Sequence, residues 1–296
     1  MQSFFVLSCL LALSLALPFE GNRFQGASDT HRSFKKALNT TELVFGGHLA
    51  RPGLLPMQAF IIYTSSLGGL RQCGGTLISR NHILTAAHCA VNLIAPSTVM
   101  LGGVNYNINT TNTQWRDINA TYVHPDYVHR VSKFNDIAVL ELETPVTLNR
   151  DVKLANLVSN DDALLENSTY AIVSGFGTYN YTNGNRSVTS EDLRYADVEI
   201  VSLEECRLLR PHSTLEETQI CAGAEGRGVG RGDSGGPLSV VSNHTIYQLG
   251  IASFATIDPD TVQNHQDRSP SVFTRVSQYC DYIASVTDEA AKCQTI

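Results

Sequence analysis

The chain has 296 residues, of which 43% are hydrophobic and 17% are charged. This composition excludes an intrinsically disordered protein, because such chains combine few apolar residues with a high charge. The net charge of −7 leaves no basic field, so we expect neither nucleic acid nor an anionic membrane among the partners.

The first predicted element is a secretory signal peptide over residues 1–16. An apolar run, FFVLSCLLALSLAL, spans residues 4–17 and is followed by Pro18 and Glu20. Its fourteen residues are too few to cross a bilayer, and the small residues Ser14 and Ala16 are typical of a cleavage site. The alternative, that this run is a buried strand or helix of the mature fold, agrees less well with its place at the N-terminus. We therefore expect a secreted, extracellular protein with no membrane segment after cleavage.

The cysteines and the N-glycosylation sequons are also typical of a secreted protein. Seven cysteines are an odd number for a disulfide framework, but Cys9 lies in the signal peptide and six remain after its removal. Seven N-x-S/T sequons permit glycosylation, at Asn39, Asn109, Asn119, Asn167, Asn180, Asn185 and Asn243.

Residues 17–43 form a polar leader. The segment is rich in Gly, Asn, Ser and Thr and has no periodic apolar pattern, so we expect it to lie outside the core.

An all-β fold is predicted beyond Val44. Short β-rich runs are separated by Gly, Asn, Pro and Asp clusters, which favours antiparallel barrels or a sandwich over a parallel α/β fold. Only residues 276–292 have apolar positions at helical spacing, which predicts one C-terminal helix. These β-rich runs include Met57–Thr64, Gly75–Leu84, Ile137–Leu142, Tyr170–Val173, Val198–Val201, Pro237–Val241, Tyr247–Phe254 and Val272–Val276.

Three short segments carry candidate catalytic residues. A serine hydroxyl becomes an effective nucleophile when an imidazole accepts its proton and a carboxylate orients that imidazole. His88, Asp136 and Ser234 are candidates for these roles, and glycines let the backbone aim the N–H groups of Gly232 and Ser234 at an oxyanion. The segments read TAAHC at 85–89, NDIAVL at 135–140 and GDSGGP at 232–237.

Each of these residues taken alone has an ordinary structural explanation: a core histidine, a strand cap and a tight turn. Taken together and in this order, the segments resemble the motifs of the chymotrypsin-like (trypsin-family) serine proteases. The resemblance runs from Val44 to the C-terminal helix. It implies two six-stranded antiparallel β-barrels with a boundary near residues 145–165, with His88 and Asp136 in the first barrel and Ser234 in the second.

The resemblance also implies a serine endopeptidase that forms an acyl-enzyme. His88 is then the general base and later the general acid, Asp136 orients it, and Ser234 is the nucleophile, with Gly232 and Ser234 as the oxyanion hole. The implied partners are protein or peptide substrates and macromolecular protease inhibitors, and the expected state is a monomer. No cofactor is implied, and the sequence contains no HExxH or CxxC motif that would indicate a metal site.

By the same resemblance, residues 17–43 are an activation propeptide and residues 44–296 are the peptidase domain. The new amino group of Val44 would pair with Asp233. The family usually begins with Ile-Val-Gly-Gly after Arg or Lys, whereas Val44 here follows Leu43. We therefore expect activation by a protease that prefers large apolar residues, either this enzyme itself or another one.

The specificity pocket implied by the family has Gly228 at its base and Ala255 and Ser271 on its walls. These residues are small and uncharged, which favours a P1 residue such as Phe, Tyr, Leu or Met. The substrate-aligning strand is implied at Ser253, Phe254 and Ala255. An alternative preference for Arg or Lys depends on the loop 256–269, whose Asp258, Asp260 or Asp267 would have to enter the pocket.

Two disulfides are implied by the family, Cys73–Cys89 and Cys206–Cys221, and we pair the remaining Cys280 with Cys293. The usual bridge beside the nucleophile is missing, because Gly230 occupies its first position. This predicts a more mobile pocket wall. A second hypothesis is a catalytically silent family member that serves as a binding module, although no triad residue is lost here.

Overall fold

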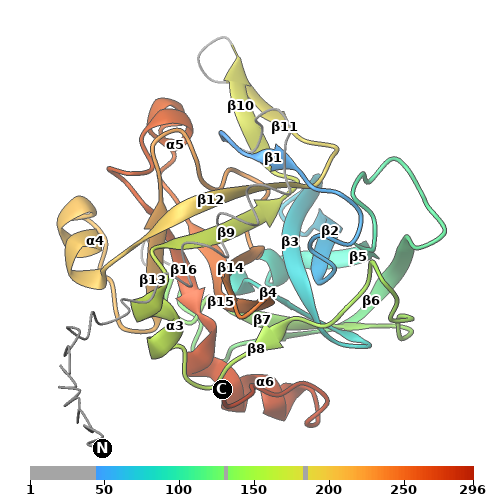
Figure 1. The fold of residues 1–296 in the computed structure, drawn as a ribbon. Coiled ribbons are helices and arrows are strands. Elements are labelled where there is room, and N and C mark those ends of the chain that lie inside the picture. The colour runs from blue at the N-terminus through green and yellow to red at the C-terminus, as the bar shows by residue number, and fades with distance from the viewer. Residues whose placement is uncertain (1–44, 130–132, 183–185) are drawn as a thin grey trace, which may run out of the picture.

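Two barrels side by side make up the structure, a computed structural model that describes residues 45–129, 133–182 and 186–296 (Figure 1). The predicted signal peptide, the propeptide, Val44, Asn39 and Asn185 lie outside the described residues.

The first barrel is closed by hydrogen bonds between its first and fourth strands. Its order is β2-β3-β4-β7-β6-β5, and every pairing is antiparallel. The predicted strand 75–84 is in fact two strands joined by a turn at Arg80 and Asn81. The strands are β2 (Gln58–Ser65), β3 (Leu70–Ser79), β4 (His82–Thr85), β5 (Leu93–Leu101), β6 (Gln114–Val123) and β7 (Ala138–Leu142).

The second barrel closes in the same way, in the order β9-β12-β13-β16-β15-β14 with β14 paired back to β9. The prediction of two six-stranded antiparallel barrels is therefore confirmed. These strands are β9 (Tyr170–Gly175), β12 (Arg194–Val201), β13 (Gln219–Gly223), β14 (Pro237–Ser242), β15 (Thr245–Phe254) and β16 (Ser271–Arg275). The short β1 (His48–Leu49) adds to β12 and β8 (Asn156–Leu157) adds to β15, while β10 (Thr178–Thr182) and β11 (Arg186–Thr189) form a separate hairpin.

Side-chain alternation along a strand gives each barrel both a core and a contact face. In β9, Ala171 and Val173 lie in the core of the second barrel, whereas Ile172 lies in the cluster between the barrels. In that cluster Phe60 of the first barrel packs edge-to-face on Phe176 of the second, with ring centroids 5.0 Å apart. The barrels thus share a packed apolar interface.

Polar side chains also cross between the barrels. Thr76 Oγ1 donates to Gln248 Oε1 at 2.7 Å, and Ser174 Oγ donates to Gln58 Oε1 at 2.7 Å. All four side chains are buried, so each partner satisfies a group that would otherwise be costly to desolvate.

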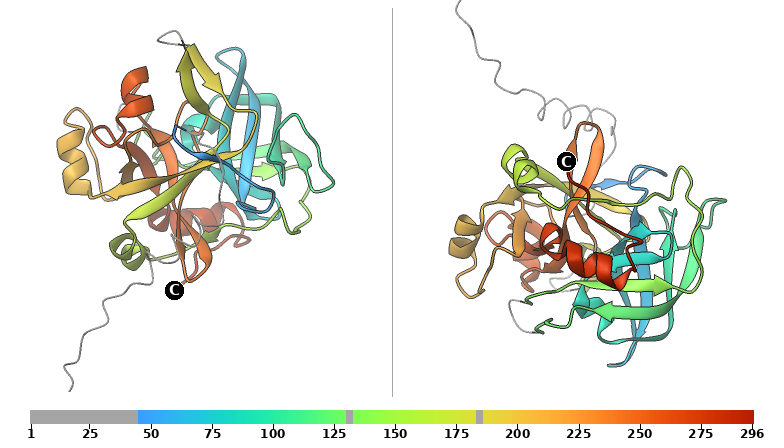
Figure 2. Two further views of the ribbon diagram at one scale, coloured as in Figure 1. Left: turned by 45° about the horizontal axis from the view of Figure 1, so that its top comes forward. Right: turned by 90° about the horizontal axis from the view of Figure 1, so that it is seen from below.

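The helices are short. The predicted C-terminal helix is present but shorter than expected: a 3-10 turn η1 (Val276–Tyr279) leads into α6 (Cys280–Val286), and the positive φ angles of Asp288 and Glu289 end it. Helix α6 lies along the first barrel, with Ile283 in the core of that barrel (Figure 2). The others are α2 (Ala87–Ala90), α3 (Asp162–Asn167), α4 (Leu203–Leu209) and α5 (Pro259–Asn264).

Three disulfides are formed, Cys73–Cys89, Cys206–Cys221 and Cys280–Cys293, and these are the pairs expected from the sequence. The third ties α6 to the tail, whose Gln294 N–H donates to the carbonyl of Leu157 at 2.7 Å. Among the described residues, no helix is long and apolar enough to cross a membrane.

We predict that Ile283→Ala lowers the free energy of unfolding by about 2–5 kcal/mol, because it leaves a cavity where α6 meets the first barrel. Ser285→Ala, at an exposed position of the same helix, should change it by less than about 0.5 kcal/mol. Urea denaturation measures both variants, and an equal effect would show that α6 is not anchored through Ile283.

Candidate active site

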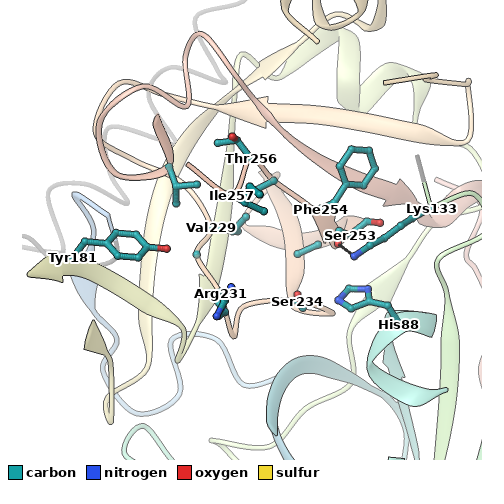
Figure 3. A pocket seen from close by; sticks show the side chains of 14 residues that line it. His88, Lys133, Tyr181, Val229, Arg231, Ser234, Ser253, Phe254, Thr256 and Ile257 are labelled. Carbon is teal, nitrogen blue, oxygen red and sulfur yellow. Dashed lines mark hydrogen bonds between the residues drawn. The ribbon is translucent and has the colours of Figure 1, made fainter. Parts of the chain in front are cut away.

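A cavity of about 390 Å³ is lined by residues of both barrels. His88 and Lys133 come from the first barrel, and Ser234 and Ser253 from the second. Figure 3 shows Ser234 beside the imidazole of His88, with Val229 and Ile257 on the side away from His88. All three sequence-predicted catalytic side chains meet here, because Asp136 lies directly behind His88.

Strand pairing brings His88 and Asp136 together. Thr85, at the end of β4, pairs with Ala138, at the start of β7, so the segments just outside these strands are neighbours. His88 lies in the single turn of α2, which the Cys73–Cys89 bridge fastens to β3. The imidazole Nδ1 lies 2.8 Å from Asp136 Oδ2, and the backbone N–H of His88 donates to Oδ1 at 2.9 Å. The carboxylate therefore fixes both the ring and the turn.

The Asp136 carboxylate has no solvent exposure. Ser253 Oγ donates to Oδ2 at 2.5 Å, and Thr274 Oγ1 donates to the backbone carbonyl of Asp136 at 2.9 Å. Burial raises the pKa of Asp136, but the neighbouring His88 and the hydrogen bonds from His88 and Ser253 outweigh burial and leave the pKa below its usual value. Asp136 thus stays ionised and can stabilise an imidazolium.

Ser234 lies in a tight turn between Gly232 and Gly235, whose φ angles are +101° and +80°. A Cβ on Gly235 would lie 2.2 Å from Thr85 Oγ1, so only glycine fits between the barrels at this point. The carbonyl of Ser234 accepts from the N–H of Gly74 at 2.7 Å. Within the described residues, the N–H groups of Gly232 and Ser234 donate to no protein group, which leaves them available to an oxyanion.

Asp233 points away from the cavity into a pocket made by glycines. Its Oδ1 accepts from the N–H of Gly177 at 2.7 Å and its Oδ2 from the N–H of Gly230 at 2.9 Å. A Cβ on Gly175 would lie 2.2 Å from Oδ1, so the absence of a side chain there makes room for the carboxylate. Burial raises the pKa of Asp233 to about 6, although both backbone hydrogen bonds oppose the shift.

Phe45 packs beside Gly230, whose N–H donates to this carboxylate. It is 1% exposed, forms an antiparallel bridge with Gly228, and stacks on Tyr181 with ring centroids 5.9 Å apart. A Cβ on Gly230 would lie 2.9 Å from the Phe45 ring and 2.2 Å from the carbonyl of Thr178. This crowding explains why the chain has glycine, and no cysteine, at position 230.

Ser253, Phe254 and Ala255 line the cavity, whereas Gly228 and Ser271 do not. The side chain of Gln266, which the sequence analysis missed, lies against both of them: Ser271 Oγ donates to its Oε1 at 2.8 Å, and a Cβ on Gly228 would lie 2.0 Å from the same atom. Val229 and Val262 line the cavity instead. No sequence motif marks Gln266, since it follows a short helix in an irregular loop.

The three acidic residues of the 256–269 loop do not line the cavity. Asp258 accepts from the Thr261 N–H at 2.8 Å as the N-cap of α5, and Asp260 Oδ1 accepts from Asn264 Nδ2 at 2.8 Å. Asp267 lies 3.6 Å from the guanidinium of Arg268. These carboxylates therefore have structural partners in their own loop.

A second residue missed from the sequence is Lys133. Its Nζ donates to the carbonyl of Ser253 at 3.0 Å across the cavity (Figure 3). Burial lowers the pKa of Lys133, and the charge of Asp136 opposes this shift. Among the described residues, no group of three His, Cys, Asp or Glu side chains is arranged to hold a metal ion.

Comparison with known proteins identifies similar sequences over most of the chain. The family model described as Trypsin matches residues 44–283. Chymotrypsin-like elastase family member 1 of Rattus norvegicus is 33% identical over 249 residues, which cover 83% of this chain and 90% of that protein. The protein of the same name from Macaca fascicularis is 34% identical over 248 residues, which cover 82% and 89%. Chymotrypsin-C of Mus musculus is 33% identical over 249 residues, which cover 83% and 89%.

We predict that Asp136→Asn slows the reaction of Ser234 with a fluorophosphonate by on the order of 10⁴-fold, because an amide holds His88 in the wrong tautomer. The labelling rate is measured after removal of residues 1–43. Asp151→Asn is the control, since Asp151 is also buried but pairs with Arg150 and Asn112 rather than with His88. A parental labelling rate for Asp136→Asn would contradict the role given to this carboxylate.

Proposed function

The chain belongs to the trypsin family and is a serine-type endopeptidase, and we propose that it is secreted as a zymogen, acts through His88, Asp136 and Ser234, and cleaves after apolar residues. The observation that carries the catalytic proposal is the Asp136–His88 pair, which faces Ser234 across one cavity.

The reaction follows from the positions of these groups. As Ser234 Oγ attacks the carbonyl carbon of the substrate, Nε2 of His88 accepts the hydroxyl proton. The resulting oxyanion receives hydrogen bonds from the N–H groups of Gly232 and Ser234. His88 then gives its proton to the leaving amine, and the acyl-enzyme ester is formed on Ser234. In the second half of the reaction His88 accepts a proton from water, the water attacks the ester carbonyl, and His88 returns the proton to Ser234 Oγ as the acid product leaves.

The substrate backbone would lie along Ser253, Phe254 and Ala255 as an added strand. Ser253 and Phe254 are the last two residues of β15, and all three residues line the cavity beside Ser234. The carbonyl of Ser253 accepts a hydrogen bond from Lys133, so it faces the cavity. A substrate N–H would use the second lone pair of this carbonyl or displace the ammonium of Lys133, and the scissile carbonyl of the peptide would then reach Ser234.

An apolar P1 preference is supported by the cavity wall. The described residues that line it include Val229, Ala252, Ile257 and Val262, and they include no carboxylate. A Lys or Arg side chain would lose its hydration in such a pocket without gaining a counter-charge. The relatives are named for chymotrypsin-like and elastase-like proteases, which agrees with this preference.

We predict that the processed enzyme cleaves a mixed peptide library mainly after Leu, Met, Phe and Tyr. Ser234→Ala should reduce the rate by about a millionfold, because it removes the nucleophile. Mass spectrometry of the products identifies the P1 residues. Dominant cleavage after Arg or Lys would support the alternative trypsin-like preference and would overturn the apolar one.

Zymogen activation is supported by the surroundings of Asp233. A buried carboxylate with a raised pKa lacks full compensation of its charge, and an ammonium group beside it would provide that compensation. Val44 would supply such a group after cleavage behind Leu43. The next residue, Phe45, packs against Gly230, whose N–H donates to the carboxylate of Asp233.

We predict that the active form begins at Val44, as N-terminal sequencing of the purified enzyme can test. Leu43 suits an apolar specificity pocket, so we expect the full-length enzyme to process itself. Purified Ser234→Ala should then remain uncleaved unless active enzyme is added. Processing of the pure variant would exclude self-activation, and any other N-terminus would exclude the proposed switch.

Further expectations concern secretion and modification. Asn109, Asn119, Asn167 and Asn243 are exposed and accessible to glycosylation, and Asn180 is half-buried. We propose a monomer that meets protein substrates and macromolecular inhibitors at the same cavity. The competing hypothesis of a silent homologue predicts that correctly processed protein is not labelled by a fluorophosphonate.

A further inference from the structure

Gln266 connects three segments at one end of the cavity. The side chain has no solvent exposure, and it follows α5 in the 256–269 loop. Nε2 donates to the carbonyl of Val229 at 2.9 Å and to the carbonyl of Val262 at 2.8 Å, while Oε1 accepts from Ser271 Oγ at 2.8 Å. Both hydrogens of the amide and one lone pair of its oxygen are therefore used.

The carboxamide occupies the space behind Gly228. A Cβ built on Gly228 would lie 2.0 Å from Oε1 and 2.3 Å from Cδ of Gln266. Gly228 and Ser271 are consequently screened from the cavity, whereas Val229 and Val262, whose carbonyls hold the amide, line it. Gln266 therefore lies directly behind two residues that line the cavity.

We propose that Gln266 closes the inner end of the specificity pocket and limits the length of the P1 side chain, an inference that rests on the proposed endopeptidase function. The side chain of Leu is shorter than the rings of Phe and Tyr, so a carboxamide in this position would admit Leu more readily than either ring. The enzyme therefore prefers P1 Leu over P1 Phe or Tyr.

The same amide holds the two walls of the pocket together. Val229 precedes Gly230, and Val262 belongs to α5. A side chain at position 230 is sterically excluded by Phe45 and Thr178, so no covalent bridge can start there. Two donated hydrogen bonds from a neutral amide join the walls instead. A glutamate could not replace it, because a carboxylate would face two carbonyl oxygens.

The experiment compares Gln266→Ala with Gln266→Met in the processed full-length enzyme. The substrates are two peptides that differ only in P1, which is Leu in one and Phe in the other. Gln266→Ala removes the carboxamide and should raise the ratio of kcat/KM for Phe over Leu by about 10-fold or more. Gln266→Met fills a similar volume without donors, so the ratio should stay near the parental one while the Tm falls.

Asn264→Ala is the matched control. This residue lies in the same loop and is exposed, and its side-chain amide donates to Asp260 Oδ1 at 2.8 Å rather than to a residue that lines the cavity. The control should leave the P1 ratio unchanged. If Gln266→Ala does not fold, Gln266→Asn, which is shorter by one methylene, should raise the ratio by a smaller factor.

A lower Tm with an unchanged P1 ratio in the alanine or asparagine variant would show that Gln266 is only structural, and would overturn the proposal. Failure of the underlying function has a different signature, because the parental enzyme would then neither cleave the peptides nor react with a fluorophosphonate. A parental enzyme that already prefers Phe to Leu would also overturn the proposed limit on P1 length.

Discussion

A carboxylate that is completely buried has to be compensated by charge and hydrogen bonds, and Asp136 obtains its partners from both barrels. His88 contributes its ring and its backbone N–H from the first barrel, while Ser253 and Thr274 contribute hydroxyls from the second. A rotation of one barrel relative to the other would therefore break hydrogen bonds to Asp136. The catalytic geometry and the packing of the barrels therefore depend on one ionised group.

A second buried carboxylate, that of Asp233, directly precedes Ser234 in the sequence and is stabilised differently. Its partners are backbone N–H groups, and glycines provide its space. Backbone donors compensate less of the charge than an imidazole does, which agrees with the raised pKa of Asp233 and the lowered pKa of Asp136. In the proposed mechanism, Asp136 acts in every turnover, whereas Asp233 responds to the formation of a new chain terminus.

The sequence predicted the candidate active site best, because the proposed reaction allows few residue types at each of its positions. The motifs around His88, Asp136 and Ser234 lead directly to the site, and β-rich runs lead to both barrels. Strands β5, β6 and β13 were not among the runs named from the sequence, and the alternation of half-buried and exposed residues in β6 gives it no apolar run. Helix α4 was missed although Ser202 and Glu205 carry a capping signature. The cavity wall was the least predictable part. Gln266 and Lys133 act through contacts between distant segments, which no local pattern reports.

The pocket walls are joined by an amide, whereas the turn that carries His88 is joined to β3 by a disulfide. These two parts of the active site consequently differ in their dependence on the redox environment. Reduction would release the His88 turn directly, but it would leave the contacts of Gln266 intact, because Val229, Val262, Gln266 and Ser271 lie in a stretch, residues 222–279, that contains no cysteine. In a reducing compartment the enzyme would lose turnover before it lost its choice of substrate.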